Sequence, residues 1–237
     1  MEKELRLQPR LACLADCVPE GARLADVGTD HAYLPVWLLL HGRISAAIAS
    51  DINALPLEHA RRTAAAYGVG GRMDFRCCPG LAEIAPEETD TVAIAGMGGE
   101  TIIAILEDAP WTARPGVTLL LQPMTKPELL RLWLTEHGYR IEEERLVRDK
   151  GVLYAVITVR GGVSEPITMA QAYCGLRLGR DALYGDYATE RIDKLRRAAE
   201  GLRQAREPEQ RARAAALEAV ARELEQRREE WKHDNGL

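Results

Sequence analysis

Two carboxylates flank a single glycine in the segment 26–30 (DVGTD), which follows a short run of apolar residues. Glycine lets the backbone approach a ligand closely. A dinucleotide site at this place would need further glycines around a pyrophosphate, and carboxylates would repel that anion. A sulfonium or ammonium group would instead be attracted by Asp26 and Asp30. The segment therefore favours S-adenosylmethionine, a cationic nucleoside cofactor, over a dinucleotide.

Asp30 has two interpretations. It stands just before a predicted helix over residues 31–41. Aspartate is a preferred N-cap residue, because its carboxylate accepts a hydrogen bond from a free amide of the first turn. The same carboxylate, placed at the end of a strand, could instead face a ligand.

Asp51 follows a second apolar run, RISAAIAS (43–50), and lies 25 residues after Asp26. An acidic residue at this place can accept hydrogen bonds from both hydroxyls of a ribose. A solvent-exposed loop aspartate is the alternative. The neighbouring cofactor motif favours the ribose contact.

A glycine-rich segment, AGMGG (95–99), follows a fourth apolar run. These glycines indicate either a floor that admits a ligand or a tight turn into the next helix. Met97 could pack on the adenine of a cofactor or on a target base. Gln122, at the end of a fifth run, could hydrogen-bond a base or could serve as a satisfied polar group at the end of a strand.

The elements that must position these residues alternate between strands and helices. Apolar runs predict strands over 22–27, 43–50, 72–77, 90–95 and 117–122, and helical patterns fall over 5–18, 31–41, 53–67, 100–108 and 129–138. Two further strands, 140–148 and 152–160, are joined by a tight turn at 149–151. This order predicts an α/β, doubly wound, mostly parallel sheet with a terminal antiparallel hairpin. Ligands bind at the carboxyl ends of the strands in such sheets, which is where the motifs above fall.

The four segments together resemble one family, the bacterial tRNA (adenine-N1)-methyltransferases of the TrmK type. The resemblance runs from Leu5 to about Val159. It rests on DVGTDHAYLP (26–35), VAIAGMGG (92–99), LLQP (120–123) and WLTEHGY (133–139). It implies a Rossmann-like class I methyltransferase domain, S-adenosylmethionine as cofactor, and methyl transfer to N1 of an adenine in tRNA, at position 22 of the D-arm.

The resemblance also implies roles for individual residues. Asp30 would be the catalytic residue. The cofactor would contact Asp26, Gly28, His31, Tyr33, Asp51, Ile52, Gly80, Ala95 and Gly96. The substrate would contact Met97, Gly98, Gln122, Arg196 and Arg197. Adenine N1 already carries a free lone pair, so positioning should dominate the rate. A carboxylate that accepts a hydrogen bond from the exocyclic amine would orient the base and stabilise the positive charge of the product.

The sequence departs from the family pattern at three places. Where the family has GDGL after the third strand, this chain has CPGL (78–81), and Pro79 lacks a side-chain acceptor for the cofactor adenine. Met124 replaces an asparagine after Gln122-Pro123, and Arg180 replaces a proline after Gly179. Two alternatives therefore stay open. One is an RNA-binding protein of this fold with weak or lost catalysis, and the other is a methyltransferase for another RNA or a small molecule.

The composition shifts near residue 161, which predicts a methyltransferase domain over 1–162 and a helical domain over 163–237. From about residue 168 the pattern is helical throughout, with apolar residues spaced as in a two-helix coiled-coil hairpin. Residues 191–232 hold 12 Lys and Arg against 9 Asp and Glu, although the whole chain has a net charge of −5. This surface is expected to contact tRNA; a solvated coiled coil or a dimer contact is the alternative. We expect a monomer or a weak homodimer.

Other classes of protein are disfavoured by composition. No run approaches the roughly 18 apolar residues of a membrane span. The five cysteines contain no CxxC pair, so a zinc cluster is not expected, and a reducing compartment fits them best. The expectation is a cytoplasmic protein without a metal and without membrane contact.

Overall fold

The computed structural model describes residues 5–205 and 207–236. The chain divides into two compact units, Met1–Glu165 and Pro166–Leu237. No described helix combines the length and the apolar character that crossing a bilayer would require.

A single seven-stranded sheet forms the centre of the first unit. Its strands are β1 (Ala22–Val27), β2 (Ile44–Asp51), β3 (Met73–Cys77), β4 (Thr91–Gly98), β5 (Thr118–Thr125), β6 (Tyr139–Asp149) and β7 (Val152–Gly161). They lie in the order β3-β2-β1-β4-β5-β7-β6. The pairs among β1 to β5 are parallel, while β7 pairs antiparallel with both β5 and β6. The predicted doubly wound sheet with a terminal antiparallel hairpin is confirmed.

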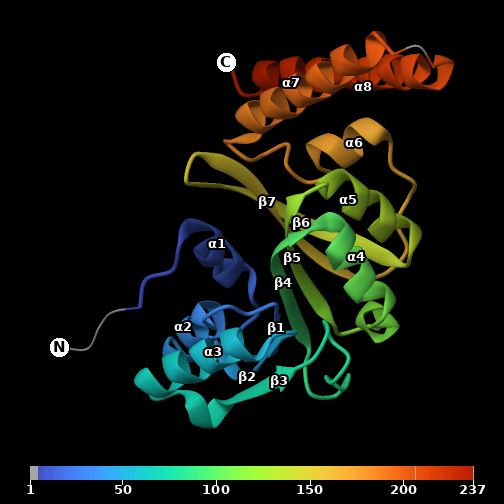
Figure 1. Cartoon of the computed structure of the whole chain (residues 1–237). Coiled ribbons are helices and arrows are strands. Elements are labelled where there is room, and N and C mark those ends of the chain that lie inside the picture. The colour runs from blue at the N-terminus through green and yellow to red at the C-terminus, as the bar shows by residue number, and fades with distance from the viewer. Residues whose placement is uncertain (1–4, 206, 237) are drawn as a thin grey trace. The chain divides into compact units, whose positions relative to one another are not determined.

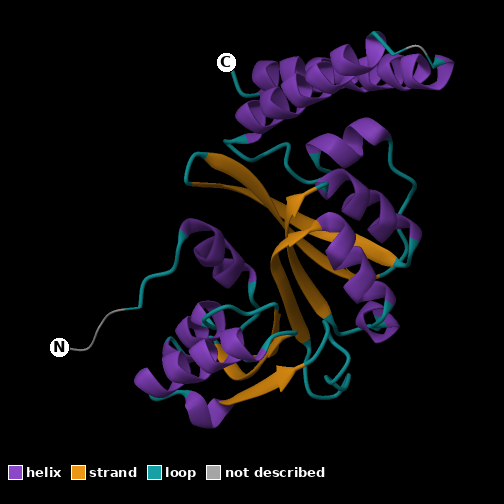
Figure 2. Cartoon of the chain, in the orientation of Figure 1, coloured by secondary structure: helices purple, strands orange, loops and turns teal. Residues whose placement is uncertain are grey.

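Helices cover both faces of this sheet (Figures 1 and 2). One face carries α1 (Pro9–Cys17), α2 (Tyr33–Leu40) and α3 (Ala54–Ala66), and the other carries α4 (Gly99–Glu107) and α5 (Pro127–Glu136). Two short 3-10 turns, η1 (Gly70–Arg72) and η2 (Pro110–Ala113), complete the connections. Each parallel strand therefore ends at the same edge of the sheet, where the loop that leads to the next helix begins.

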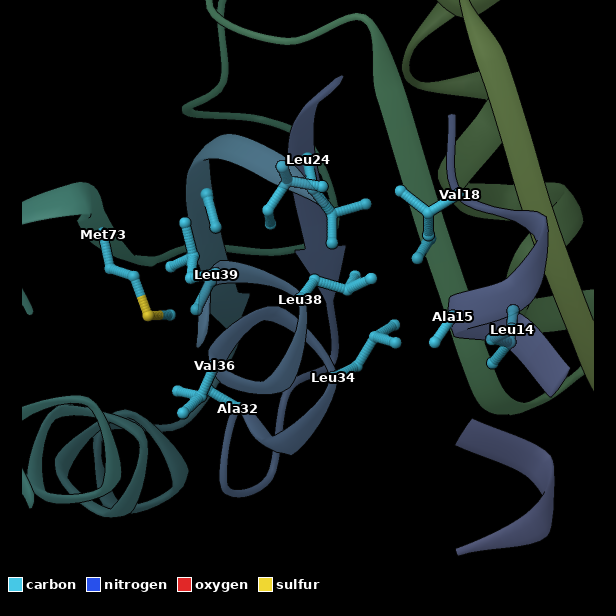
Figure 3. Packing of buried hydrophobic residues seen from close by; sticks show 14 of the residues in the cluster. Leu14, Ala15, Val18, Leu24, Ala32, Leu34, Val36, Leu38, Leu39 and Met73 are labelled. Carbon is cyan, nitrogen blue, oxygen red and sulfur yellow. The ribbon is translucent and has the colours of Figure 1, made fainter. Parts of the chain in front are cut away.

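A core of leucine, valine and alanine packs α1, α2 and α3 against the sheet (Figure 3). Leu14 of α1, Val18 directly after that helix, and Leu34 and Leu38 of α2 are at most 2% exposed. Ala32, which precedes α2, belongs to the same cluster and is 1% exposed. Burial of Ala32 anchors the turn after β1, so that the residues just before it are held at the strand edge.

The second unit consists of α6 (Met169–Cys174), α7 (Tyr184–Arg203) and α8 (Pro208–Asp234). The two long helices run antiparallel: Arg196 pairs with Glu225, and Arg203 pairs with Glu218. The predicted helical hairpin is thus present. The prediction of helix throughout from residue 168 is wrong between α6 and α7, because Gly175 has a φ of +85°, which ends α6.

Candidate functional site

A cavity of about 370 Å³ opens where β1, β2 and β4 end. Fourteen residues line it: Val27, Gly28, Ser50, Asp51, Ile52, Asn53, Pro79, Gly80, Leu81, Met97, Thr101, Ala104, Ile105 and Asp108. This is the edge at which doubly wound sheets bind their ligands. Five of the residues expected from the sequence line it: Gly28, Asp51, Ile52, Gly80 and Met97.

Gly28 forms the floor of the cavity. Its φ of +74° is in the left-handed region, and its amide donates a hydrogen bond to the carbonyl of Ser50, at 2.8 Å. A Cβ at this position would collide with the terminal methyl of Met97. Met97 reaches this place because β4 has an irregular register around Gly96, whose φ is +79°. The positive φ therefore favours glycine at residue 28, and a Cβ there would also force the flexible end of Met97 to move.

The walls of the cavity are mainly apolar. Ile52 follows β2 and lines the cavity, and 67% of this apolar residue is exposed. Its side chain is therefore accessible to a ligand. Gly80, which also lines the cavity, approaches the side chain of Ile105 in α4 so closely that a Cβ would lie 3.0 Å from it. Apolar pockets with few polar groups are typical of small-ligand sites, and apolar walls suit a flat aromatic group.

The α4 wall was missed by the sequence analysis. Thr101, Ala104, Ile105 and Asp108 line the cavity, and their spacing places them on one face of the helix. The i, i+3, i+4, i+7 pattern was visible in the sequence, but it could equally have marked a face packed on the sheet. The pattern alone gave no means of choosing between these two roles.

Asp51, the last residue of β2, also lines the cavity. Its carboxylate accepts a hydrogen bond from the amide of Asn53, at 2.7 Å, which fixes its orientation. The backbone carbonyl of Asp51 accepts a hydrogen bond from the amide of Cys78, and Ser50 donates to the carbonyl of Gly80. These bonds join the loop after β3 to the end of β2, so both sides of the cavity are held together.

Asp26 lies beneath the turn, near the end of β1, and is only 9% exposed. Burial raises the pKa of its carboxyl to about 6, and a hydrogen bond from the hydroxyl of Thr29 opposes part of that rise. Thr29 is itself buried, and its hydroxyl oxygen accepts a hydrogen bond from the amide of Ala32. Asp26 does not line the cavity. It presents a desolvated carboxyl close to the turn, where a cation would favour its ionised form.

Asp30 projects from the turn, and its side chain is 78% exposed. It is not the N-cap of α2: the helix begins at Tyr33, the N-cap residue is Ala32 with a φ of 54°, and Thr29 receives the Ala32 amide. The N-cap interpretation of Asp30 is therefore wrong. The carboxylate lies 3.6 Å from Nε2 of His31.

Three rings form a stack beside Asp30. The His31 ring lies between Tyr33 and His59, with centroid distances of 5.1 and 4.8 Å and interplanar angles of 10° and 7°. His59 comes from α3, so the stack joins the turn after β1 to the neighbouring helix. Neither His31 nor Tyr33 lines the cavity. The two residues lie on the side of the turn that carries Asp30.

Asp30, His31 and His59 could hold a metal ion. Within the described part of the chain they are the one group of three such residues whose ligand atoms lie within 4.8 Å of one another. Two ligands bound to zinc at about 2.1 Å cannot be more than about 4.2 Å apart. The side chains would therefore have to move closer together around an ion.

The remaining predicted residues are placed differently. Ala95, Gly96 and Gly98 belong to the irregular end of β4 but do not line the cavity. Gln122 is fully buried; its side-chain oxygen accepts a hydrogen bond from Arg10, and its amide nitrogen donates to the carbonyl of Pro123. Gln122 therefore supports the strand end and is not presented to a base.

Arg196 and Arg197 belong to α7, in the second unit. The Arg196 guanidinium is 2.7 Å from the Glu225 carboxylate, and Arg197 donates a hydrogen bond to the carbonyl of Asp193. Both arginines are exposed, so both remain accessible to a polyanion.

Comparison with known proteins places the chain among methyltransferases. A family model described as "Methyltransferase domain" matches residues 7–157. The tRNA (adenine(22)-N(1))-methyltransferase of Bacillus subtilis is 34% identical over 184 residues, which cover 78% of this chain and 75% of that protein.

Solved structures agree with this comparison. The B. subtilis m1A22 tRNA methyltransferase TrmK superposes with a TM-score of 0.85 at 29% identity, over 93% of this chain and 99% of that one. A putative tRNA (m1A22) methyltransferase from Streptococcus pneumoniae, in complex with S-adenosyl-L-methionine, has a TM-score of 0.79 at 30% identity, over 91% of this chain and 97% of that one.

Proposed function

This chain belongs to the tRNA (adenine(22)-N(1))-methyltransferase family, and from this membership we infer that it methylates N1 of adenine 22 in tRNA with S-adenosylmethionine as the methyl donor. The observation that carries the proposal is the cavity at the carboxyl ends of β1, β2 and β4, since Gly28 lines it and the exposed Asp30 follows two residues later in the same turn. The methyl donor and the acceptor base can then meet at the turn after β1.

The residues around the cavity fit a cationic nucleoside. Asp51 can accept hydrogen bonds from the ribose hydroxyls, while Ile52 and Ile105 offer apolar walls to the adenine. The Gly28 floor leaves room for the backbone to approach the ligand closely. Asp26 supplies a buried carboxyl that a positively charged ligand would hold ionised. When bound, S-adenosylmethionine supplies an electrophilic methyl group on a sulfonium sulfur.

The chemistry requires little from the protein beyond placement. The lone pair of adenine N1 forms the new bond to the methyl carbon while the bond from that carbon to sulfur breaks, and the positive charge passes to the base. The Asp30 carboxylate can accept a hydrogen bond from the exocyclic amine of the target adenine and can stabilise this charge. We assign Asp30 as the catalytic residue on this basis. The His31 stack holds the turn that carries it.

The tRNA substrate implies further expectations for the whole protein. The reaction needs no metal, because N1 requires neither deprotonation nor a Lewis acid to expose its lone pair. We propose that residues 1–162 carry out the chemistry, that residues 163–237 contribute to tRNA binding, and that the enzyme acts in the cytoplasm as a monomer or weak homodimer. The exposed arginines of α7 support the tRNA-binding role.

The decisive experiment incubates the full chain with methyl-labelled S-adenosylmethionine and unmodified tRNA, followed by nucleoside mapping. We expect label in 1-methyladenosine at position 22, and none in a transcript in which adenine 22 is changed to guanine. Cofactor binding without label in any tRNA adenine would favour another substrate. Absence of cofactor binding at millimolar concentration would overturn the enzyme assignment and favour an RNA-binding protein of this fold.

A further inference from the structure

We propose that Asp108 recognises the exocyclic amine of the cofactor adenine, and so makes the cavity selective for a 6-aminopurine. This inference rests on the proposed function, because it assumes that the cavity holds the nucleoside of S-adenosylmethionine. It assigns a binding role to a residue outside every motif in the sequence.

The first argument is the position of Asp108 on α4. Thr101, Ala104, Ile105 and Asp108 form the stripe of this helix that faces the cavity. Seven residues separate Thr101 from Asp108, which corresponds to about 10 Å along the helix axis. Thr101 follows Met97 and Gly98 closely in the chain, at the end that holds Gly28 and Asp51. Asp108 consequently marks the opposite end of the cavity.

The second argument is the chemistry between these ends. Asp51 and Asp108 supply the two carboxylates among the lining residues, and apolar side chains such as Leu81 and Ile105 lie along the walls. If Asp51 holds the ribose, the base must extend along the apolar walls toward the other end. The group that meets Asp108 there must donate a hydrogen bond. An amine on carbon 6 of a purine donates, whereas a carbonyl oxygen at the same place would be repelled.

The third argument is the loop across the cavity from α4. Pro79 offers neither a side-chain acceptor nor a backbone N–H. The loop approaches α4 directly, since Gly80 packs against Ile105, which lies one helical turn before Asp108. The loop supplies no side-chain acceptor at this end of the cavity. The carboxylate of Asp108, at the end of α4, can therefore supply the acceptor instead.

The fourth argument is that Asp108 has no structural task that would explain a carboxylate. It is the C-cap residue of α4, where the helix dipole disfavours a negative charge. Its backbone amide donates to Ala104, but its side chain has no hydrogen bond or ion pair with any described residue. The adjacent Glu107, by contrast, accepts a hydrogen bond from the indole of Trp133. The Asp108 carboxylate is thus available to a ligand.

The test compares two ligands by calorimetry on the full chain: S-adenosylhomocysteine, and its analogue with hydrogen in place of the 6-amino group. Asp108→Ala should weaken binding of S-adenosylhomocysteine roughly 10- to 50-fold, as expected for a lost hydrogen bond to a charged group. The same variant should change the affinity of the analogue less than about twofold. Asp108→Asn, which keeps an acceptor oxygen, should recover most of the loss.

Glu107→Ala is the matched control, because it removes a neighbouring carboxylate that does not line the cavity, and it should leave both affinities unchanged. Equal weakening of both ligands by Asp108→Ala, or no weakening of either, would overturn the inference. A wild-type chain that binds neither ligand would instead overturn the proposed function, so the two failures are distinguishable.

Discussion

Asp26 combines two properties that ordinarily exclude each other, deep burial and a charge-bearing group. Because burial raises the pKa of its carboxyl to about 6, the free protein binds a proton there that is released between pH 5 and pH 7. A ligand that carries a positive charge favours the ionised form and lowers this pKa. Cofactor binding and proton release should therefore be linked.

The first prediction concerns cofactor affinity. The dissociation constant of S-adenosylmethionine should fall as the pH rises from 5 to 7, by up to about tenfold per unit below pH 6, and should level off above pH 7. The Asp26→Asn variant should bind more weakly at pH 7.5 and should show a flat profile. Calorimetry at several pH values measures both, with the exposed Asp16→Asn as the control. A wild-type profile that is flat between pH 5 and 7 would contradict the linkage.

The second prediction concerns stability without the cofactor. The folded-state pKa of Asp26 is raised above its usual value of 3.8, so its contribution to stability is complete below pH 3.8 and is lost as the pH rises through 6. At pH 7.5 the ionised, buried carboxyl should cost roughly 2–3 kcal/mol. Asp26→Asn should therefore unfold at a higher temperature than wild type at pH 7.5, and this advantage should shrink toward pH 4. Equal melting temperatures at pH 7.5 would argue against the raised pKa.

The third prediction concerns Asp30. Because this side chain is exposed and does not cap α2, Asp30→Ala should leave the melting temperature and the tRNA affinity nearly unchanged while it reduces kcat roughly 100-fold. Asp30→Asn separates two roles, since it keeps an acceptor for the exocyclic amine but loses the charge. If positioning dominates, Asn restores most of the activity; if charge stabilisation dominates, it does not. A parallel loss of stability in Asp30→Ala would return the residue to a structural role.

The predicted residues that line the cavity owe their position to short-range constraints. Gly28 stands directly after β1 and Asp51 is the last residue of β2, so the position of the strand ends was enough to bring them to the cavity. Gln122 also stands at a strand end, but its side chain points into the protein and is satisfied by Arg10, which is 112 residues away in the chain. A partner so distant along the chain could not be foreseen from a local pattern. Asp108 lies seven residues after Thr101, at the end of α4. It reaches the cavity because α4 packs against the loop after β3, and this packing could not be predicted from the sequence.

At the scale of the elements, the alternation of apolar runs and helical patterns was sufficient to predict every strand of the sheet. Each predicted strand overlaps its observed bounds. The parallel strands β1, β4 and β5 were the easiest to recognise, because buried parallel strands are nearly continuous apolar runs. The helix starts were less predictable. α2 begins two residues later than predicted, because Thr29 captures the amide of Ala32 and holds the intervening turn outside the helix.

One contact between elements leads to the fourth prediction. Arg131 of α5 and Glu144 of β6 form an ion pair of 2.7 Å in which both side chains are 0% exposed. Glu144→Leu would take this carboxylate away from a guanidinium that is shielded from water, so it should cost roughly 3–5 kcal/mol of unfolding free energy. The double variant Arg131→Met/Glu144→Leu should recover most of this loss. Urea denaturation of the two variants decides the matter: a double variant as unstable as the single one would contradict the interpretation.

At the scale of the whole molecule, charge is distributed unevenly. Residues 1–160 hold 17 Lys and Arg against 22 Asp and Glu, whereas residues 191–232 hold 12 against 9. An acidic unit that must act on a polyanion needs a basic surface elsewhere in the chain to offset the repulsion. The α7–α8 pair supplies cationic groups, and its intrahelical and interhelical ion pairs keep them in a fixed arrangement. Binding of tRNA should therefore depend on salt through this unit.

The fifth prediction follows from that dependence. Arg196→Ala/Arg197→Ala should weaken tRNA binding about tenfold at low salt and should reduce the slope of log K against log salt by roughly 1 to 2, because each lost phosphate contact releases one fewer counterion. Cofactor affinity should not change. Glu225→Gln is an informative control, since it breaks the same ion pair as Arg196→Ala but leaves the arginine free, and it should bind tRNA as tightly as wild type or more tightly. Filter binding between 50 and 200 mM salt measures the slopes, and melting temperatures check that the helices remain paired. If Glu225→Gln weakens binding as much as the double arginine variant, the α7–α8 pair acts through its structure and not through contact with phosphates.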